Sequence, residues 1–206
     1  MSKKMLGPYT QSYMPLGDLH IQFYHGQAVH SFERNLNLKT ATSHVEYKIG
    51  EVKYTREMFS SYPDQIIVIR LHTSKPGYLH FTASLGSSLM FQTTSNQDQL
   101  ILRGICPEHV DPSYYNTNKP IIYGDPVTTE AITFEGRLGV KTEDGSVKVD
   151  HNGIHIMGAT TVTLYLVIEP SFEVFEDGKN ISVKKMANNR VSFETMAGKN
   201  YLVKRI

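Results

Sequence analysis

The residues best suited to chemistry lie close together in one polar segment, EHVD at 108–111. In an extended segment alternate side chains point to opposite sides, so His109 and Asp111 share one side. An imidazole and a carboxylate placed in this way can orient each other or share a ligand. Two tyrosines follow directly and offer aromatic surface of the kind on which sugars stack. The candidate site residues are therefore Glu108, His109, Asp111, Tyr114 and Tyr115.

Three histidines recur every five residues, at His20, His25 and His30, which raises the question of a metal site. A tetrahedral site needs ligands that converge on one point. On an extended strand His20 shares a face with Gln22 and Tyr24, whereas His25 begins a turn, and nothing brings the third histidine back. We expect scattered surface histidines, no metal site and no cofactor.

The remaining candidate groups are single carboxylates and one thiol. Asp18 follows a glycine and Asp64 follows a proline, positions where aspartate commonly forms turns by bonding to its own backbone. Cys106 is the only cysteine, so it forms no internal disulfide, and it has no positioned base that would activate it. We expect turn roles for both aspartates and a structural or incidental thiol.

The elements that carry these residues are predicted to be strands, because the hydrophobic period is two almost throughout. Clean alternation occurs over residues 44–49, 132–141 and 162–168. Residues 65–71 are apolar on both faces, which predicts a central strand covered on both sides. Asp144-Gly145 and Asn152-Gly153 predict the turns of a β-meander. Many short strands at regular spacing predict an all-β fold, an antiparallel β-sandwich.

Two segments interrupt this pattern. Residues 104–125 contain three prolines, which disfavours a central strand, and long loops inside compact domains are often functional. A second break follows the apolar strand that ends near residue 170. We therefore expect a β-sandwich over residues 1–170 and a short β-rich extension, such as a meander, over residues 171–206.

Composition excludes several classes of function. Twenty-one basic residues balance 20 acidic ones, so the chain lacks the basic surface expected of a nucleic-acid-binding protein or a membrane-surface protein. No apolar stretch approaches the roughly 20 residues of a membrane span. The first residues lack the apolar region of a signal peptide, which leaves a cytoplasmic location as the default expectation.

Three motifs in order resemble the N-terminal domain of family-95 glycoside hydrolases, the α-L-fucosidases. They are GPYTQSYMPLGDL at 7–19, YTREMFSSYPDQ at 54–65, and the long loop with CPEHVDPSYY at 106–115 and IIYGD at 121–125. The resemblance covers about residues 7–168. It implies a β-supersandwich, which agrees with the periodicity.

The resemblance also implies a parent reaction, inverting hydrolysis of α-L-fucosyl or α-L-galactosyl linkages. In that family a helical barrel follows the sandwich and holds the catalytic acid and base. The family's PLGNGRLGA and NEDTLW segments do not occur here, and 38 residues after position 168 do not make a barrel. We therefore expect no catalytic residue in this chain, which should be inactive alone, and the candidate site residues would line the rim of the sugar pocket.

Three alternatives stay open. In the first, the loop at 104–125 only packs against a catalytic barrel and stiffens the interface. In the second, the chain is a stand-alone carbohydrate-binding module, although it has no tryptophan for sugar stacking. In the third, the chain has a structural or oligomerisation role through exposed sheet edges. The expected partners are a glycan or fucosylated oligosaccharide, a catalytic barrel, or a second copy.

Overall fold

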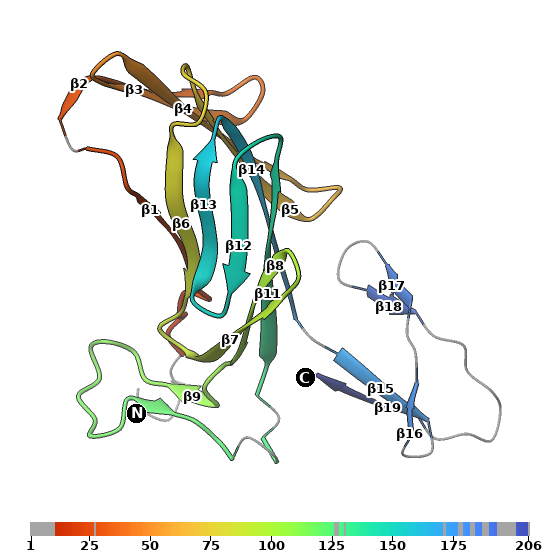
Figure 1. The fold of residues 1–206 in the computed structure, drawn as a ribbon. Coiled ribbons are helices and arrows are strands. Elements are labelled where there is room, and N and C mark those ends of the chain that lie inside the picture. Colours follow the sequence, from red (N-terminus) through yellow and green to blue (C-terminus); the bar gives the residue numbers. More distant parts are fainter. Residues whose placement is uncertain are drawn as a thin grey trace.

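Regular structure in the computed structural model consists of β-strands (Figure 1). Within the described residues no helix is long and apolar enough to cross a membrane. All paired strands of the two large sheets run antiparallel, so the predicted all-β antiparallel class is confirmed. The structure describes residues 11–26, 28–125, 128–129, 131–170, 172–176, 179–181, 184–186, 190–192 and 201–205.

The larger sheet has eight strands, and its order departs from chain order where β5 pairs with β14. Val68 of β5 pairs with Tyr165 of β14, which joins two segments almost a hundred residues apart. In spatial order the strands are β2 (Val29–Asn37), β3 (Thr42–Ile49), β4 (Val52–Ser61), β5 (Ile66–Thr73), β14 (Thr161–Pro170), β11 (Thr133–Thr142), β8 (Gln99–Ile105) and β7 (Met90–Asn96).

The smaller sheet has four strands and packs against the first one, so the two sheets form a sandwich (Figure 1). Its order is β1 (Asp18–Phe23), β6 (Leu79–Gly86), β13 (Gly153–Ala159) and β12 (Ser146–Asp150). Two further short strands, β9 (His109–Val110) and β10 (Ile121–Ile122), pair with each other inside the long loop.

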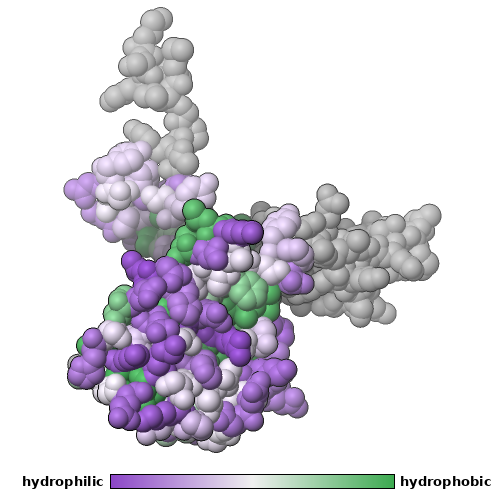
Figure 2. All heavy atoms as spheres, turned by 90° about the horizontal axis from the view of Figure 1, so that it is seen from above, coloured by the Kyte–Doolittle hydropathy of each residue, from purple (hydrophilic) through white to green (hydrophobic). Residues whose placement is uncertain are grey.

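The core lies between the facing sides of the two sheets. Phe81 and Ile156 of the smaller sheet and Leu138 and Leu164 of the larger one are fully buried. A second buried cluster consists of Leu89, Leu102 and Phe134, and it packs against Leu85 and Cys106. Figure 2 looks down on the molecule and shows mainly hydrophilic residues on that face, with hydrophobic ones exposed among them.

The alternation predicted over residues 44–49, 132–141 and 162–168 corresponds to β3, β11 and β14. The prediction for 65–71 is correct in position and wrong in coverage. β5 is central, but only Ile67, Ile69 and Leu71 face the core, whereas Arg70 is exposed. The second sheet covers only one face of the larger sheet, so the other face of β5 remains at the surface.

Two turn predictions need correction. Asn152-Gly153 forms the expected hairpin between β12 and β13, but Asp144-Gly145 connects β11 of the larger sheet to β12 of the smaller one. The predicted meander is therefore split between two sheets. Asp64 lies in a turn, as predicted, but its carboxylate accepts a hydrogen bond from the Ser61 hydroxyl rather than from the backbone. Asp18 instead begins β1, where it pairs with Gly86.

Beyond β14 the described strands pair only among themselves. They are β15 (Phe172–Glu176), β16 (Lys179–Ile181) and β19 (Tyr201–Arg205) in one sheet, and β17 (Lys184–Met186) with β18 (Arg190–Ser192) in another. The predicted boundary near residue 170 remains a prediction.

Candidate functional site

The candidate residues lie on the loop that leaves β8 and returns to β11. Its two ends are held together because the Cys106 amide donates to the Ile132 carbonyl at 2.8 Å. Within the loop β9 and β10 form a small ladder, which the Glu108 amide extends by donating to the Ile122 carbonyl at 2.9 Å. The prolines limit regular pairing to these few residues, as the sequence predicted.

His109 and Asp111 form the pair that the alternation predicted. His109 Nε2 lies 2.8 Å from Asp111 Oδ1, and the Thr117 hydroxyl donates to Asp111 Oδ2 at 2.6 Å. The Thr117 and His109 hydrogen bonds hold the pKa of the Asp111 carboxyl below its usual value. Both carboxylate oxygens are therefore engaged in holding the loop.

Glu108 points away from this pair, as expected for the neighbouring position of an extended segment. Its Oε1 accepts a hydrogen bond from the Thr129 hydroxyl at 2.6 Å. A Cβ atom at Gly124 would lie 2.0 Å from the same oxygen, so the glycine leaves the space that the carboxylate fills. Glu108 thus links the loop to residues just before β11.

The two tyrosines are exposed, as is Glu108. Tyr114 is 74% exposed and Tyr115 is 47% exposed. The Tyr115 amide donates to the Pro112 carbonyl at 2.8 Å, which forms a turn. The structure therefore places aromatic surface and a carboxylate–imidazole pair on one loop, and their role at a sugar pocket remains a prediction.

A general acid for glycoside hydrolysis requires a carboxyl group with a raised pKa, together with a second carboxylate. Among the described carboxyl groups, each one with a resolved shift has its pKa lowered, namely Glu51, Asp111, Glu135, Asp144 and Asp150. Lowered values favour the charged form, which can accept hydrogen bonds and cannot donate a proton. Each of these five carboxyl groups is therefore suited to accepting hydrogen bonds or to ion pairing.

The histidine prediction requires one correction. His25 is not a scattered surface residue, because its ring stacks on Phe23 with 5.1 Å between the centroids and its Nε2 lies 2.7 Å from the Tyr47 hydroxyl. Tyr47 in turn stacks on Tyr54. Burial raises the pKa of Tyr47 to about 12. The described residues contain no group of three potential metal ligands.

A second polar arrangement, which sequence reasoning missed, crosses the outer face of the smaller sheet. The Tyr24 hydroxyl lies 2.7 Å from Thr82 Oγ1, which lies 2.9 Å from His155 Nδ1. His155 Nε2 completes the chain 3.2 Å from Asp150 Oδ1. The order hydroxyl, imidazole, carboxylate matches that of a nucleophilic triad.

Nucleophilic chemistry also needs amide donors that stabilise an oxyanion. Thr82 lies in the middle of β6, which pairs with β1 on one side and β13 on the other, so the sheet uses the neighbouring amides. We therefore assign the chain of hydrogen bonds to fixing four strands side by side. The alternation of polar residues within each strand was the sequence signal for these side chains. The sequence does not show which strands are neighbours, so it could not predict that the side chains meet.

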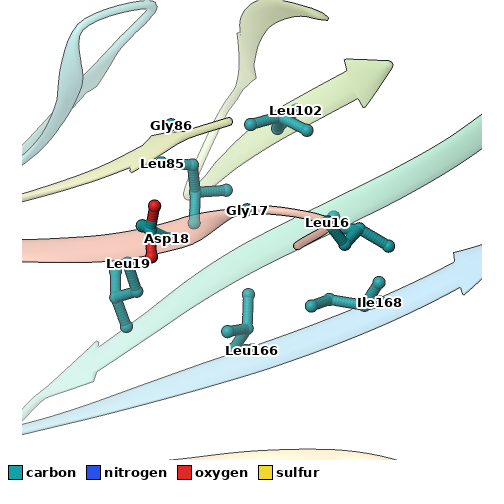
Figure 3. A pocket seen from close by; sticks show the side chains of 10 residues that line it. Leu16, Gly17, Asp18, Leu19, Leu85, Gly86, Leu102, Leu166 and Ile168 are labelled. Atoms are coloured by element: carbon teal, nitrogen blue, oxygen red, sulfur yellow. The ribbon is translucent and has the colours of Figure 1, made fainter. Parts of the chain in front are cut away.

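One hollow lies between the sheets beside the start of β1. Its volume is about 30 Å³, close to that of one water molecule. Figure 3 shows the apolar side chains around it, with the segment at Gly17 crossing the middle. It is too small and too apolar for a sugar, and it is lined by Leu16, Gly17, Asp18, Leu19, Leu85, Gly86, Leu102, Gly136, Leu166 and Ile168.

Comparison with known proteins adds a family and two relatives. A family model described as "Glycosyl hydrolase family 65, N-terminal domain" matches residues 1–174. The chain is 33% identical to alpha-L-fucosidase 2 of Arabidopsis thaliana over 152 residues, which is 69% of this chain and 17% of the relative. It is 36% identical to a probable alpha-fucosidase A of Aspergillus niger over 67 residues, 32% of this chain and 8% of the relative. The chain thus spans less than a fifth of either relative.

Proposed function

Because the chain belongs to the family of glycosyl hydrolase family 65 N-terminal domains, we propose that it is the non-catalytic sandwich of an α-L-fucosidase-like glycoside hydrolase. Its finer assignment to family 95 is part of the same proposal and is supported by the names of the two relatives. The parent reaction would be inverting hydrolysis of α-L-fucosyl or α-L-galactosyl linkages, with the catalytic groups supplied by another part of the enzyme.

The observation that supports the non-catalytic role is that both oxygens of the Asp111 carboxylate are engaged in hydrogen bonds inside the loop, with His109 and Thr117, which leaves neither oxygen free to activate water as a general base. A catalytic acid must hold a proton near neutral pH, whereas the Thr117 and His109 hydrogen bonds lower the pKa of this carboxyl. The loop is instead built as a firm polar surface with two exposed tyrosines. We assign it to the rim of a sugar pocket that is completed by a catalytic domain.

An activity assay tests the proposal. The purified chain should release no 4-nitrophenol from 4-nitrophenyl α-L-fucoside above the rate in buffer. The variants Glu108→Gln and Asp111→Asn should give the same trace as the unaltered chain. Turnover by the unaltered chain that either variant abolishes would contradict the non-catalytic role.

The exposure of Tyr114 and Tyr115 supports a second candidate function, direct glycan binding. Stacking of a sugar ring on a tyrosine side chain is a weak interaction, so binding in the millimolar range is expected. Calorimetric titration with a fucosylated oligosaccharide should then give saturable heat that disappears in the double variant Tyr114→Ala, Tyr115→Ala. Tyr62→Ala is a matched control, since that tyrosine is also exposed but lies in the turn after β4. A flat titration at millimolar ligand would exclude this function.

A further inference from the structure

The core-facing side of the larger sheet continues past the region that the smaller sheet covers. Leu36 of β2, Ser43 of β3, Met58 of β4 and Ile69 of β5 form one cross-strand row. In this row Ile69 is 6% exposed, Met58 is 40% exposed and Leu36 is 60% exposed, while Ser43, between the last two, is half-buried. The covered core therefore passes into open surface within three strands.

β2 has the pattern of a strand that buries one face. Phe32 and Leu36 lie on the core-facing side with Arg34, while the opposite side carries Ser31, Glu33 and Asn35. Phe32 is nevertheless 65% exposed, and all nine residues of β2 are exposed. Alternation of this kind normally matches a buried face, so something outside the described residues is needed to cover it.

Two arginines lie in the cross-strand row next to the one that contains Leu36 and Met58. Arg34 pairs with Val45, and Val45 pairs with Arg56. Among the described residues no carboxylate forms an ion pair with either arginine. The guanidinium carbon of Arg56 lies 5.5 Å from the Phe23 ring centroid, and its Nε is buried without a hydrogen-bond acceptor. Arg56 is thus partly covered by the smaller sheet, whereas Arg34 is exposed and is the cation that a carboxylate on a ligand can reach.

We propose that this uncovered face binds an extended polypeptide segment that presents a carboxylate between two apolar side chains. The uncovered face consists of Phe32, Arg34, Leu36 and Met58, and the half-buried Val45 and Arg56 lie at its edge. Phe32 and Leu36 are four residues apart, about 13 Å along a strand. A segment lying along β2 would therefore place apolar residues at positions i and i+4 and an acidic residue at i+2.

Charge distinguishes this occupant from a second copy of the chain. Two copies meeting face to face would place both Arg34 guanidinium groups in one interface, and the face itself carries no carboxylate to pair with them. Like charges held together in an interface are costly unless they are compensated. An acidic segment instead pairs with Arg34 and covers Phe32 and Leu36.

Fluorescence polarisation with two labelled peptides tests the proposal. Thr-Val-Thr-Glu-Thr-Val-Thr places two valines and a glutamate on one side, and the control peptide has lysine in place of glutamate. The glutamate peptide should bind the full chain at least about tenfold more tightly than the lysine peptide, a difference of about 1.4 kcal/mol. Equal binding of the two peptides, or binding of neither, would overturn the proposal.

Three variants locate the interaction. Arg34→Glu should reverse the preference between the peptides, and Phe32→Ser should weaken glutamate-peptide binding by at least about tenfold. Both positions are exposed, so the unfolding midpoint should change little. Glu33→Gln, on the opposite side of β2, should leave binding unchanged. Light scattering tests whether a second copy of the chain occupies the face instead. A dimer that Phe32→Ser dissociates would assign the face to a second copy and overturn the proposal.

Discussion

His109 Nε2 and Asp111 Oδ1 lie 2.8 Å apart on the same side of the loop that joins β8 to β11. One residue separates them, so the contact is a direct consequence of extended backbone at this point. The Val110 side chain between them points the other way and is buried. Local alternation therefore both anchors the loop and assembles its polar pair.

The first prediction concerns acid. Because the pKa of Asp111 is lowered in the folded chain, its stabilising effect should be complete above its usual value near 3.8 and should be lost as the pH falls through the lowered folded value. The difference in unfolding free energy between the unaltered chain and Asp111→Asn should therefore shrink as the pH falls below 3.8. Urea titrations between pH 6 and pH 2 measure this difference. Asp98→Asn, in the exposed turn before β8, is the control; a difference for Asp111→Asn that persists unchanged at pH 2 would contradict the linkage.

The second prediction concerns close packing at Gly104. A Cβ atom there would lie 2.2 Å from the Phe134 ring and 2.9 Å from the Met90 carbonyl oxygen. Since Phe134 belongs to a buried cluster and the carbonyl is backbone, Gly104→Ala should cost about 1–3 kcal/mol of unfolding free energy. Gly139→Ala on β11 is the matched control, because a Cβ atom there has open space, and it should be neutral or slightly stabilising. Similar results for the two variants would contradict the packing at Gly104.

A third prediction concerns the main core. Phe81 is fully buried between the sheets, so Phe81→Ala should cost about 3–5 kcal/mol. Phe32→Ala removes the same atoms from an exposed position and should change stability by less than about 0.5 kcal/mol. Denaturant unfolding of both variants gives the comparison. A large loss of stability in Phe32→Ala would mean that the face around it is already covered.

The fourth prediction concerns the single thiol. Burial raises the pKa of Cys106, which lowers the fraction of reactive thiolate. Alkylation by iodoacetamide at pH 8 should therefore be slower than that of free cysteine, and it should reach the free rate in 8 M urea. Mass spectrometry over time measures both rates. Fast alkylation in the folded state would assign Cys106 a reactive role.

Much of the fold was predictable because side-chain alternation is a property of the local chain. A period of two predicts which residues share a face in β3, β11 and β14, and it also predicts the His109–Asp111 pair. The wrong predictions were those that depended on neighbours in space. Arg70 is exposed because the second sheet covers only one face of β5, and the Asp144-Gly145 turn changes sheets.

Residues a few positions apart in the sequence are enough to predict the strand class, the two alternating faces of β3, β11 and β14, and the polar content of one loop. Which strands adjoin depends on the packing of the whole chain. The bond between Thr82 and His155 spans 73 residues of chain, and Phe32 remains exposed because the smaller sheet does not extend over β2. Pairing and coverage depend on the packing of the whole sandwich, because any strand with the right alternation can pair with several others.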